Sequence, residues 1–316
     1  MPWSNDCERL HFFAGHLPSL TGETLARRLS TSMAGPLLLV DAPYLLYRAF
    51  FALPDSIKGA DGRPVNALLG STNAILAVAE EQGARAVVTC FGPDAAPYRV
   101  ELYSRYHVHR PPMPDDLAHQ WQLAPRLHEA LGWRVVADDS LEADDLLGSL
   151  AGVEERAGGR ALILTGDRDM FQCASERVSV LLLGGRGRRG PEEVGPAEVK
   201  ARYGIGPELV PDFIALRGDP SDGLPGLKGI GAKRAADILR RHGSLAAALD
   251  AADRDGPERN ILAPARAELE AYREIATLRE VPLERPPDAP TDRSRGAAVA
   301  EELGMKKLGE RLRDGA

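Results

Sequence analysis

The chain has 316 residues, 44% of them hydrophobic, which is enough apolar material for one large domain or two of moderate size. Its formal net charge of −7 excludes a uniformly basic surface, so contacts with a polyanion would have to come from local basic stretches. Cys7, Cys90 and Cys173 fit no disulfide framework or Cys-x-x-Cys zinc site, and we find neither a secretory leader nor eighteen consecutive apolar residues. We therefore expect a cytoplasmic protein with no membrane partner.

Residues 1–34 show no helix or strand period, and we interpret them as a loosely ordered N-terminal extension. From residue 35 to about 192, apolar runs typical of buried parallel strands alternate with helical patterns. The apolar runs cover 37–40, 86–91, 161–164 and 178–183, and the helical patterns cover about 66–81, 115–131 and 142–156. This alternation predicts an α/β fold with a mostly parallel central sheet covered on both faces.

The remainder of the chain has a different pattern. Residues 184–190 are interpreted as a basic, glycine-rich loop, and the pattern of residues 193–281 is mostly helical with short Gly- and Pro-rich breaks. We predict that 193–281 is a second, α-helical region. Residues 282–316 are expected to hold a linker or surface crossing and one short helix at about 297–313.

Eight carboxylates fall in four tight groups, each at the end of an apolar run or in a turn. They are Asp41; Glu142, Asp144 and Asp145; Asp167 and Asp169; and Asp219 and Asp222. Parallel strands end at one edge of a sheet, so acids that follow them can converge there, where they repel one another unless a cation neutralises them. The pattern therefore predicts a divalent-metal site. Taken singly, each group has an ordinary alternative: a cap or turn, favourable charge at a helix start, or an Asx turn.

A glycine turn follows the last acidic group. Gly229 and Gly231 lie between Lys228 and a helical stretch that carries Lys233 and Arg234. Glycines allow a close backbone approach, and free amides at a helix start bind phosphate, so this pattern favours a helix-hairpin-helix that holds DNA without reading its bases. The alternative is an ordinary loop between two helices.

Aromatic rings and cations alternate between residues 98 and 110. Arg99, Tyr106, His107 and Arg110 belong to this stretch, in which rings can stack on unpaired bases while cations hold phosphates. The alternative is a solvated helix face with partly buried tyrosines. Zinc ligation by the histidines is not expected, because no matching Cys or His cluster exists elsewhere.

In this order, the motifs resemble those of the bacterial 5′-3′ exonuclease and flap endonuclease family, which includes the 5′-nuclease domain of DNA polymerase I. The resemblance runs from about residue 37 to about residue 280 and rests on the four acidic groups, the Arg/Tyr stretch and the glycine turn. It implies a PIN-like catalytic domain at 35–192, a helical arch over the site, and a helix-hairpin-helix (H3TH) region at 193–281 that contributes Asp219 and Asp222. We expect a stand-alone nuclease and a monomer.

The resemblance also implies residue roles. Asp41, Glu142, Asp144 and Asp145 would lie near one Mg²⁺ or Mn²⁺ ion, and Asp167, Asp169, Asp219 and Asp222 near a second. Arg99 and Arg110 would steer the scissile phosphate, Tyr106 would stack on a frayed base, and a K⁺ ion is implied at the hairpin turn. The implied partner is DNA with 5′ flaps, nicks or 5′ ends.

Two positions depart from the family pattern. The family usually has Asp where this chain has Gly92, which would weaken the first metal site unless Asp94 compensates. It also usually has Lys where this chain has His107, and neutral His stabilises phosphate less well. These departures leave an alternative function open: a DNA-structure-binding relative with weakened or lost nuclease activity.

Overall fold

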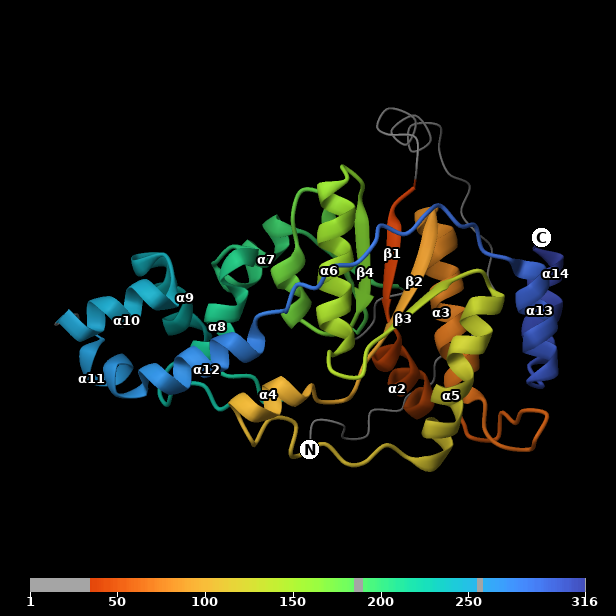
Figure 1. The fold of residues 1–316 in the computed structure, drawn as a ribbon, viewed down its shortest axis with the longest axis horizontal. Helices are drawn as coiled ribbons and strands as arrows, with labels where there is room; N and C mark the ends of the chain where they lie inside the picture. Colours follow the sequence, from red (N-terminus) through yellow and green to blue (C-terminus); the bar gives the residue numbers. More distant parts are fainter. Residues whose placement is uncertain (1–34, 185–189, 255–257, 316) are drawn as a thin grey trace.

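The computed structural model describes residues 35–184, 190–254 and 258–315, so the predicted N-terminal extension and most of the basic loop lie outside the described residues. A six-stranded sheet in the order β3-β2-β1-β4-β5-β6 forms the centre of the molecule (Figure 1). Its strands are β1 Leu37–Asp41, β2 Ala86–Phe91, β3 Arg134–Ala137, β4 Ala161–Thr165, β5 Val178–Leu182 and β6 Glu192–Val194. The first five strands run parallel, and β6 is antiparallel to β5. The predicted mostly parallel α/β sheet is therefore confirmed.

Strands β1, β2, β4 and β5 coincide with the four apolar runs. Strands β3 and β6 were not expected from the sequence. β3 is an edge strand of four residues whose side chains are only partly buried, and β6 has three residues, two of them glutamates. Neither supplies the continuous apolar run that marks a strand covered on both faces.

Alternate residues of β1 enter two different cores because successive strand side chains point to opposite faces. Leu37 and Leu39 pack with α6 and the helices of the C-terminal half, whereas Leu38 and Val40 pack with the helices on the other face. The helices of the sheet region are α2 Ala42–Ala52, α3 Asn66–Gln82, α4 Pro97–Leu102, α5 Asp115–Ala130 and α6 Ala143–Arg156, with a 3₁₀ turn η1 at Asp169–Cys173. The three predicted helices correspond to α3, α5 and α6.

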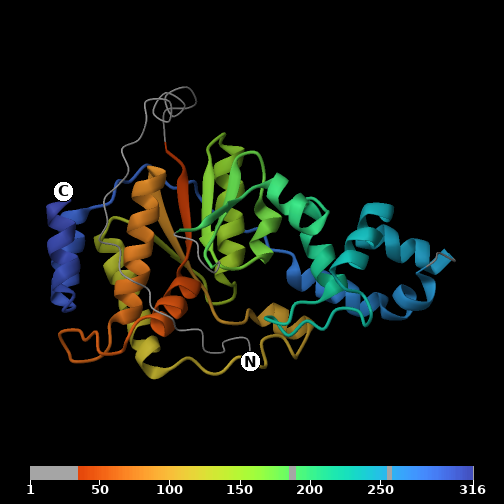
Figure 2. The same cartoon turned by 180° about the vertical axis from the view of Figure 1, so that it is seen from behind.

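A helical lobe lies beside the sheet on the side of β4 to β6, at the left of Figure 1 and the right of Figure 2. Its elements are α7 Pro196–Tyr203, η2 Pro207–Leu209, α8 Val210–Arg217, α9 Ala232–His242, α10 Leu245–Arg254, α11 Arg259–Leu262, η3 Ala263–Ala265 and α12 Arg266–Ala276. The apolar residues of this lobe share one continuous core with α6 and one face of the sheet. The lobe is therefore held against the sheet by apolar packing.

After α12 the chain crosses back over the molecule in extended form to its opposite end (Figure 1). Glu154 of α6 accepts hydrogen bonds from Arg85, 2.6 Å away, and from Arg285 of the crossing segment, 2.8 Å away, which fastens the crossing at the amino-terminal edge of the sheet. The predicted surface crossing is present. The single helix expected at 297–313 was wrong, because the chain forms two helices, α13 Arg293–Glu302 and α14 Lys306–Asp314. Gly304, with a φ of +86°, ends the first of them in the left-handed region that favours glycine.

No helix in the described ranges is both long and apolar enough to cross a membrane.

Candidate active site at the carboxyl edge of the sheet

Asp41 is the last residue of β1, where the strand reaches the carboxyl edge of the sheet, and it caps α2. Its Oδ1 accepts a hydrogen bond from the Tyr44 amide at 3.0 Å, and its Oδ2 accepts one from the Thr165 hydroxyl at 2.6 Å. Because Thr165 ends the neighbouring strand β4 and its hydroxyl also accepts from the Asp167 amide, two acidic groups are joined through one side chain. The predicted convergence of the first and third groups is therefore present.

Four of the eight carboxylates have no ion pair with a described Lys or Arg. They are Asp41, Asp144, Asp167 and Asp169. Burial and repulsion from neighbouring acids raise the pKa of Asp144 and of Asp169 well above the usual range. Burial, followed by the charge of Asp222, raises the pKa of Asp167 to about 7. Burial also raises the pKa of Asp41, which is 5% exposed. A bound cation would stabilise these four carboxylates, because it would neutralise their negative charge in place of protons.

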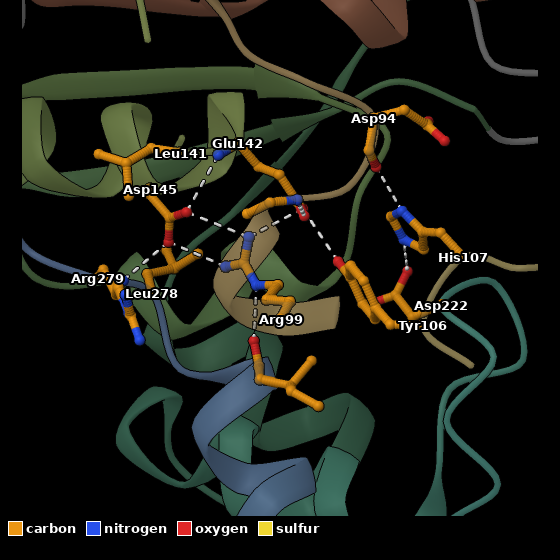
Figure 3. A network of polar contacts seen from close by, with 12 residues as sticks. Asp94, Arg99, Tyr106, His107, Leu141, Glu142, Asp145, Asp222, Leu278 and Arg279 are labelled. Carbon is orange, nitrogen blue, oxygen red and sulfur yellow. Dashed lines mark hydrogen bonds and ion pairs between the residues drawn. The ribbon is translucent and has the colours of Figure 1, made fainter. Parts of the chain in front are cut away.

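Glu142 and Asp145 are neutralised within the protein by Arg99. The Arg99 guanidinium is 3% exposed and lies 2.9 Å from Glu142 Oε2 and 2.9 Å from Asp145 Oδ1 (Figure 3). Asp145 also accepts from the Tyr98 hydroxyl at 3.1 Å and forms a capping box with Glu142 at the start of α6. A cation so enclosed cannot reach a phosphate without breaking two buried ion pairs, which argues against the predicted phosphate contact of Arg99.

Tyr106 is also turned inward. Its hydroxyl donates to Glu142 Oε2 at 3.0 Å, its side chain is 5% exposed, and its ring stacks on His107 with 3.9 Å between centroids. Stacking of Tyr106 on a frayed base, as the resemblance implied, would require this ring to leave its site. The predicted arch is not helical between α4 and α5: residues 103–114, here called the arch segment, form turns and loop, and Tyr106 lies in these turns.

His107 joins this arch segment to the fourth acidic group. Its Nε2 lies 3.1 Å from Asp222 Oδ1, and its Nδ1 is hydrogen-bonded to the Asp94 carbonyl oxygen (Figure 3). Arg110, at 37% side-chain exposure, pairs with Asp94 at 2.9 Å and reaches Asp222 at 3.5 Å. Arg110 is thus the accessible cation of the two predicted to steer phosphate.

Asp219 lies in a tight turn with Asp222. The Asp219 amide donates to Leu224 O at 2.9 Å and the Leu224 amide donates back at 2.8 Å, which closes the turn. The Asp219 carboxylate accepts from Ser221 N at 2.8 Å and pairs with Arg217 at 3.2 Å. Asp219 is therefore held by its own turn and by a cation.

The structure changes the interpretation of Gly92. A Cβ added at this residue would lie 2.4 Å from Leu141 O and 2.7 Å from Ala143 N, both backbone atoms at the start of α6. The space for a carboxylate is therefore filled by the approach of α6 to the end of β2. Asp94 does not take over the position in this arrangement, because its carboxylate is half-exposed and pairs with Arg110.

The predicted helix-hairpin-helix is present at the start of α9. Gly229 has a φ of +83°, and Gly231 precedes the first residue of α9, whose amino-terminal end has no side-chain cap. A Cβ at either glycine would meet nothing within 4 Å, so the turn faces open space. Lys228, Lys233 and Arg234 are exposed around it. Free amides and exposed cations together suit a phosphate backbone.

The acids of the described residues are not gathered into a ready-made cage. No group of three or more of their His, Cys, Asp and Glu side chains could hold a metal ion as they stand. Hydrated magnesium suits this arrangement better than a fully dehydrated ion would, because magnesium keeps several of its own waters.

Sequence reasoning gave no role in the site to several residues, although Tyr98 and Thr165 lie inside the motifs that it used. Tyr98, Thr165, Arg217 and Gln172 bond to the acidic groups or their backbone, yet each is a common residue without a distinctive spacing. The only available signal was position, since Thr165 and Gln172 flank the third acidic group.

Acidic residues at the carboxyl edge of a mostly parallel sheet, next to a helix-hairpin-helix lobe, are the arrangement that the family models describe. The 5′-3′ exonuclease N-terminal resolvase-like domain matches residues 36–204, and the 5′-3′ exonuclease C-terminal SAM fold matches residues 205–294. The chain belongs to the 5′-3′ exonuclease family.

Relatives and solved structures agree with this assignment. The chain is 38% identical over 241 residues to a 5′-3′ exonuclease of Mycobacterium tuberculosis, covering 70% of this chain and 75% of that protein. It is 35% identical over 302 residues to DNA polymerase I of Mycobacterium bovis, covering 92% of this chain. The match spans 33% of that polymerase, so the chain corresponds to about a third of its length.

Two solved structures share the fold at low sequence identity. T5 5′-exonuclease, solved with divalent zinc ions bound, has a TM-score of 0.64 at 17% identity and covers 88% of this chain and 98% of its own. The catalytic core of Rad2 in complex with DNA substrate has a TM-score of 0.57 at 14% identity and covers 88% of this chain and 91% of its own.

Proposed function

We propose that this chain is a divalent-metal-dependent 5′-3′ exonuclease and structure-specific 5′ flap endonuclease that hydrolyses DNA phosphodiester bonds in replication and repair. The observation that carries this proposal is a set of four acids without basic partners among the described residues, Asp41, Asp144, Asp167 and Asp169. Burial raises the pKa of all four, and repulsion from neighbouring acids adds to it for Asp144, Asp167 and Asp169. A purely structural acidic cluster would be expected to have basic partners, as the other four carboxylates do.

The residues present fit Mg²⁺ or Mn²⁺, because they offer carboxylate oxygens only, the ligands that these hard cations prefer. Asp41, Asp144, Asp167 and Asp169 would hold the metal, with Glu142, Asp145, Asp219 and Asp222 around it, two ions in all as the family implies. Bound there, the metal supplies an activated water and charge stabilisation at the attacked phosphate. We retain K⁺ at the hairpin turn as a family-based proposal.

The chain's own residues supply the remaining roles. Arg110 binds the scissile phosphate from the arch segment when it leaves Asp94. The amides at the start of α9, with Lys228, Lys233 and Arg234, hold the duplex backbone without reading its sequence. Because the contacts recognise backbone, the substrates are defined by structure: 5′ flaps, nicks and 5′ ends. We further propose a cytoplasmic monomer.

Asp167→Asn tests this function. The variant should fold but lose cleavage of a labelled 5′ flap in Mg²⁺ by a factor on the order of 100 or more, as expected when a metal ligand is removed. Asp139→Asn, at an exposed position outside the acidic groups, is the matched control. Unchanged turnover by Asp167→Asn would contradict the metal assignment.

A second function is favoured by one observation. Since α6 fills the space beside Gly92, the family's usual carboxylate is absent, and the chain could have become a DNA-structure-binding relative. Tight flap binding by the wild type, without cleavage in either Mg²⁺ or Mn²⁺, would support this alternative. Cleavage of single-stranded RNA equal to that of the flap would instead point to an RNA substrate.

A further inference from the structure

The chain segment that leaves α12, residues 275–281, is hydrogen-bonded by side chains from three other parts of the molecule. We refer to it as the α12 exit. Its backbone atoms bond to Arg99 (Ile275 O, 3.0 Å), Gln172 (Ala276 O, 2.9 Å, and Leu278 N, 3.1 Å), Asp145 (Arg279 N, 2.8 Å) and Ser149 (Val281 N, 3.0 Å). These side chains come from α4, η1 and α6. Figure 3 shows the Arg99 and Asp145 part of this arrangement.

Gln172 connects the α12 exit to the backbone of Asp169, a candidate metal-binding residue. It lies three residues after Asp169, and its Nε2 donates both to Asp169 O at 2.9 Å and to Ala276 O at 2.9 Å. Its Oε1 accepts from Leu278 N at 3.1 Å. Only an amide offers two donor hydrogens and an acceptor in this geometry, because a carboxylate has no donor when ionised.

The α12 exit is connected to the rest of the helical lobe by polar contacts and shared packing. Asp212 of α8 pairs with Arg273 of α12 at 2.5 Å and also accepts from Leu245 N at the start of α10, 2.8 Å away. Buried residues of α8, α9 and α12 share one apolar core, and α9 carries the hairpin turn. A continuous path of packed helices therefore joins the hairpin turn to residues 275–281.

We propose that Gln172 is a positioning residue that couples engagement of duplex DNA by the helical lobe to the placement of Asp169. This inference rests on the proposed nuclease function and deepens it. Duplex bound at the α9 turn fixes α12, and the Gln172 amide then holds η1, with Asp169 at its start, at a set distance from the α12 exit. The rate of cleavage depends on this distance, because small misplacements of a catalytic group lower rates by up to about 100-fold.

The test crosses two variants with two substrates. Gln172→Glu removes both donors and keeps the size and one acceptor; Gln122→Glu makes the same charge change at an exposed position of α5. Each protein is given a flap with a long downstream duplex, which reaches the lobe, and a flap with a duplex too short to do so. Single-turnover rates and DNA dissociation constants are measured, with thermal unfolding to monitor the fold.

Wild type should cleave the long substrate faster than the short one, and Gln172→Glu should reduce this ratio about 10-fold or more while Gln122→Glu leaves it unchanged. If Gln172→Glu only destabilised the fold, the cleavage rates of both substrates would fall by the same factor and their ratio would not change. An unchanged ratio would therefore overturn the proposed coupling. Absence of all cleavage by the wild type would contradict the proposed function instead.

Hydrogen exchange gives a second answer that needs no cleavage. A DNA duplex without a flap or free 5′ end is added to the wild type in Ca²⁺. Backbone amide hydrogen exchange is then followed in a peptide covering residues 168–174. Coupling predicts slower exchange there on duplex binding, and loss of this effect in Gln172→Glu. An unchanged peptide in wild type that binds the duplex would overturn the inference even if Gln172→Glu folds poorly. Failure of the duplex to bind would instead contradict the DNA contact proposed for the start of α9.

Discussion

The imidazole Nε2 of His107 lies 3.1 Å from Oδ1 of Asp222, although 115 residues separate them in the chain. The His107 amide also donates to the Asp222 carbonyl oxygen at 3.1 Å, so both the backbone and the side chain join the arch segment to the fourth acidic group. His107 has a φ of +54°, the only left-handed backbone among the described non-glycine residues. This strained position is maintained by the contacts around it.

Removal of the His107 side chain should lower the affinity for metal more than it lowers the cleavage rate at saturating metal. Without the imidazole, Asp222 retains only Arg110 at 3.5 Å, and loss of a side chain that orients a metal ligand costs about 10- to 100-fold in metal affinity or activity. His107→Ala should therefore raise the Mn²⁺ concentration for half-maximal flap cleavage by about 10-fold or more. Exposed His109→Ala is the control, and equal Mn²⁺ requirements in both variants would contradict the positioning of Asp222 by His107.

Adjacent acids at the start of α6 should respond oppositely to loss of charge. Asp145→Asn removes a carboxylate that is fully buried and paired with Arg99, and breaking such a pair costs about 3–5 kcal/mol in the free energy of unfolding. Asp144→Asn relieves repulsion from Asp167 and Asp41, so the metal-free protein should become more stable.

Urea unfolding in EDTA and flap cleavage in Mn²⁺ separate the two residues. The Asp144→Asn protein should lose cleavage with no decrease in its free energy of unfolding. The main effect of Asp145→Asn should be a lower free energy of unfolding. A destabilised Asp144→Asn protein would contradict the repulsion between Asp144 and its neighbouring acids. An Asp145→Asn protein as stable as the wild type would contradict the stabilising pair of Asp145 with Arg99.

Restoring the family's usual carboxylate at Gly92 should not increase activity. The added Cβ meets backbone atoms of α6 at 2.4 and 2.7 Å, and overpacking of this kind typically costs about 1–3 kcal/mol. Gly92→Asp and Gly92→Ala should both lower the midpoint of thermal unfolding, because the Cβ is common to them. A several-fold gain in cleavage by Gly92→Asp alone would show that α6 can move aside.

The sequence was sufficient to predict four of the six strands and the position of the acids at the strand ends, but not β3, β6 or the state of charge of the acids. Strand polarity predicts that Asp41 and Asp167 share the carboxyl edge of the sheet, whereas the pairing of β1 with β4 that brings them together comes from the structure. The division between neutralised and unneutralised acids depends on Arg99, 46 residues from Asp145 and buried against it. No local pattern indicates such a pairing.

Close backbone approaches were equally hidden from the sequence. At Gly92 the pattern suggested a weakened metal site, whereas the physical cause is the packing of β2 against the first residues of α6. The break between α13 and α14 at Gly304 was missed because one glycine within a helical pattern is often tolerated. In both cases the tertiary contact decides what the glycine does.

His128 should make the protein sensitive to acid. Burial lowers the pKa of His128 to about 3, and its ring is fully enclosed with Nδ1 3.1 Å from the Thr89 hydroxyl. The unfolded chain has an ordinary His pKa near 6.5 and takes up a proton that the folded chain rejects, so stability present above pH 6.5 falls as the pH is lowered toward 3. At pH 5 the loss from this group is about 2 kcal/mol relative to neutral pH.

Comparison with His128→Asn isolates this contribution. The acids with raised pKa values act with the opposite sign, because they gain protons on folding and stabilise the protein as the pH falls, but they are common to both proteins and cancel. The difference in free energy of unfolding between wild type and His128→Asn should therefore shift by about 2 kcal/mol between pH 7 and pH 5, in favour of the variant at pH 5. Parallel pH profiles from urea denaturation would mean that His128 is protonated in the folded protein or becomes accessible to water.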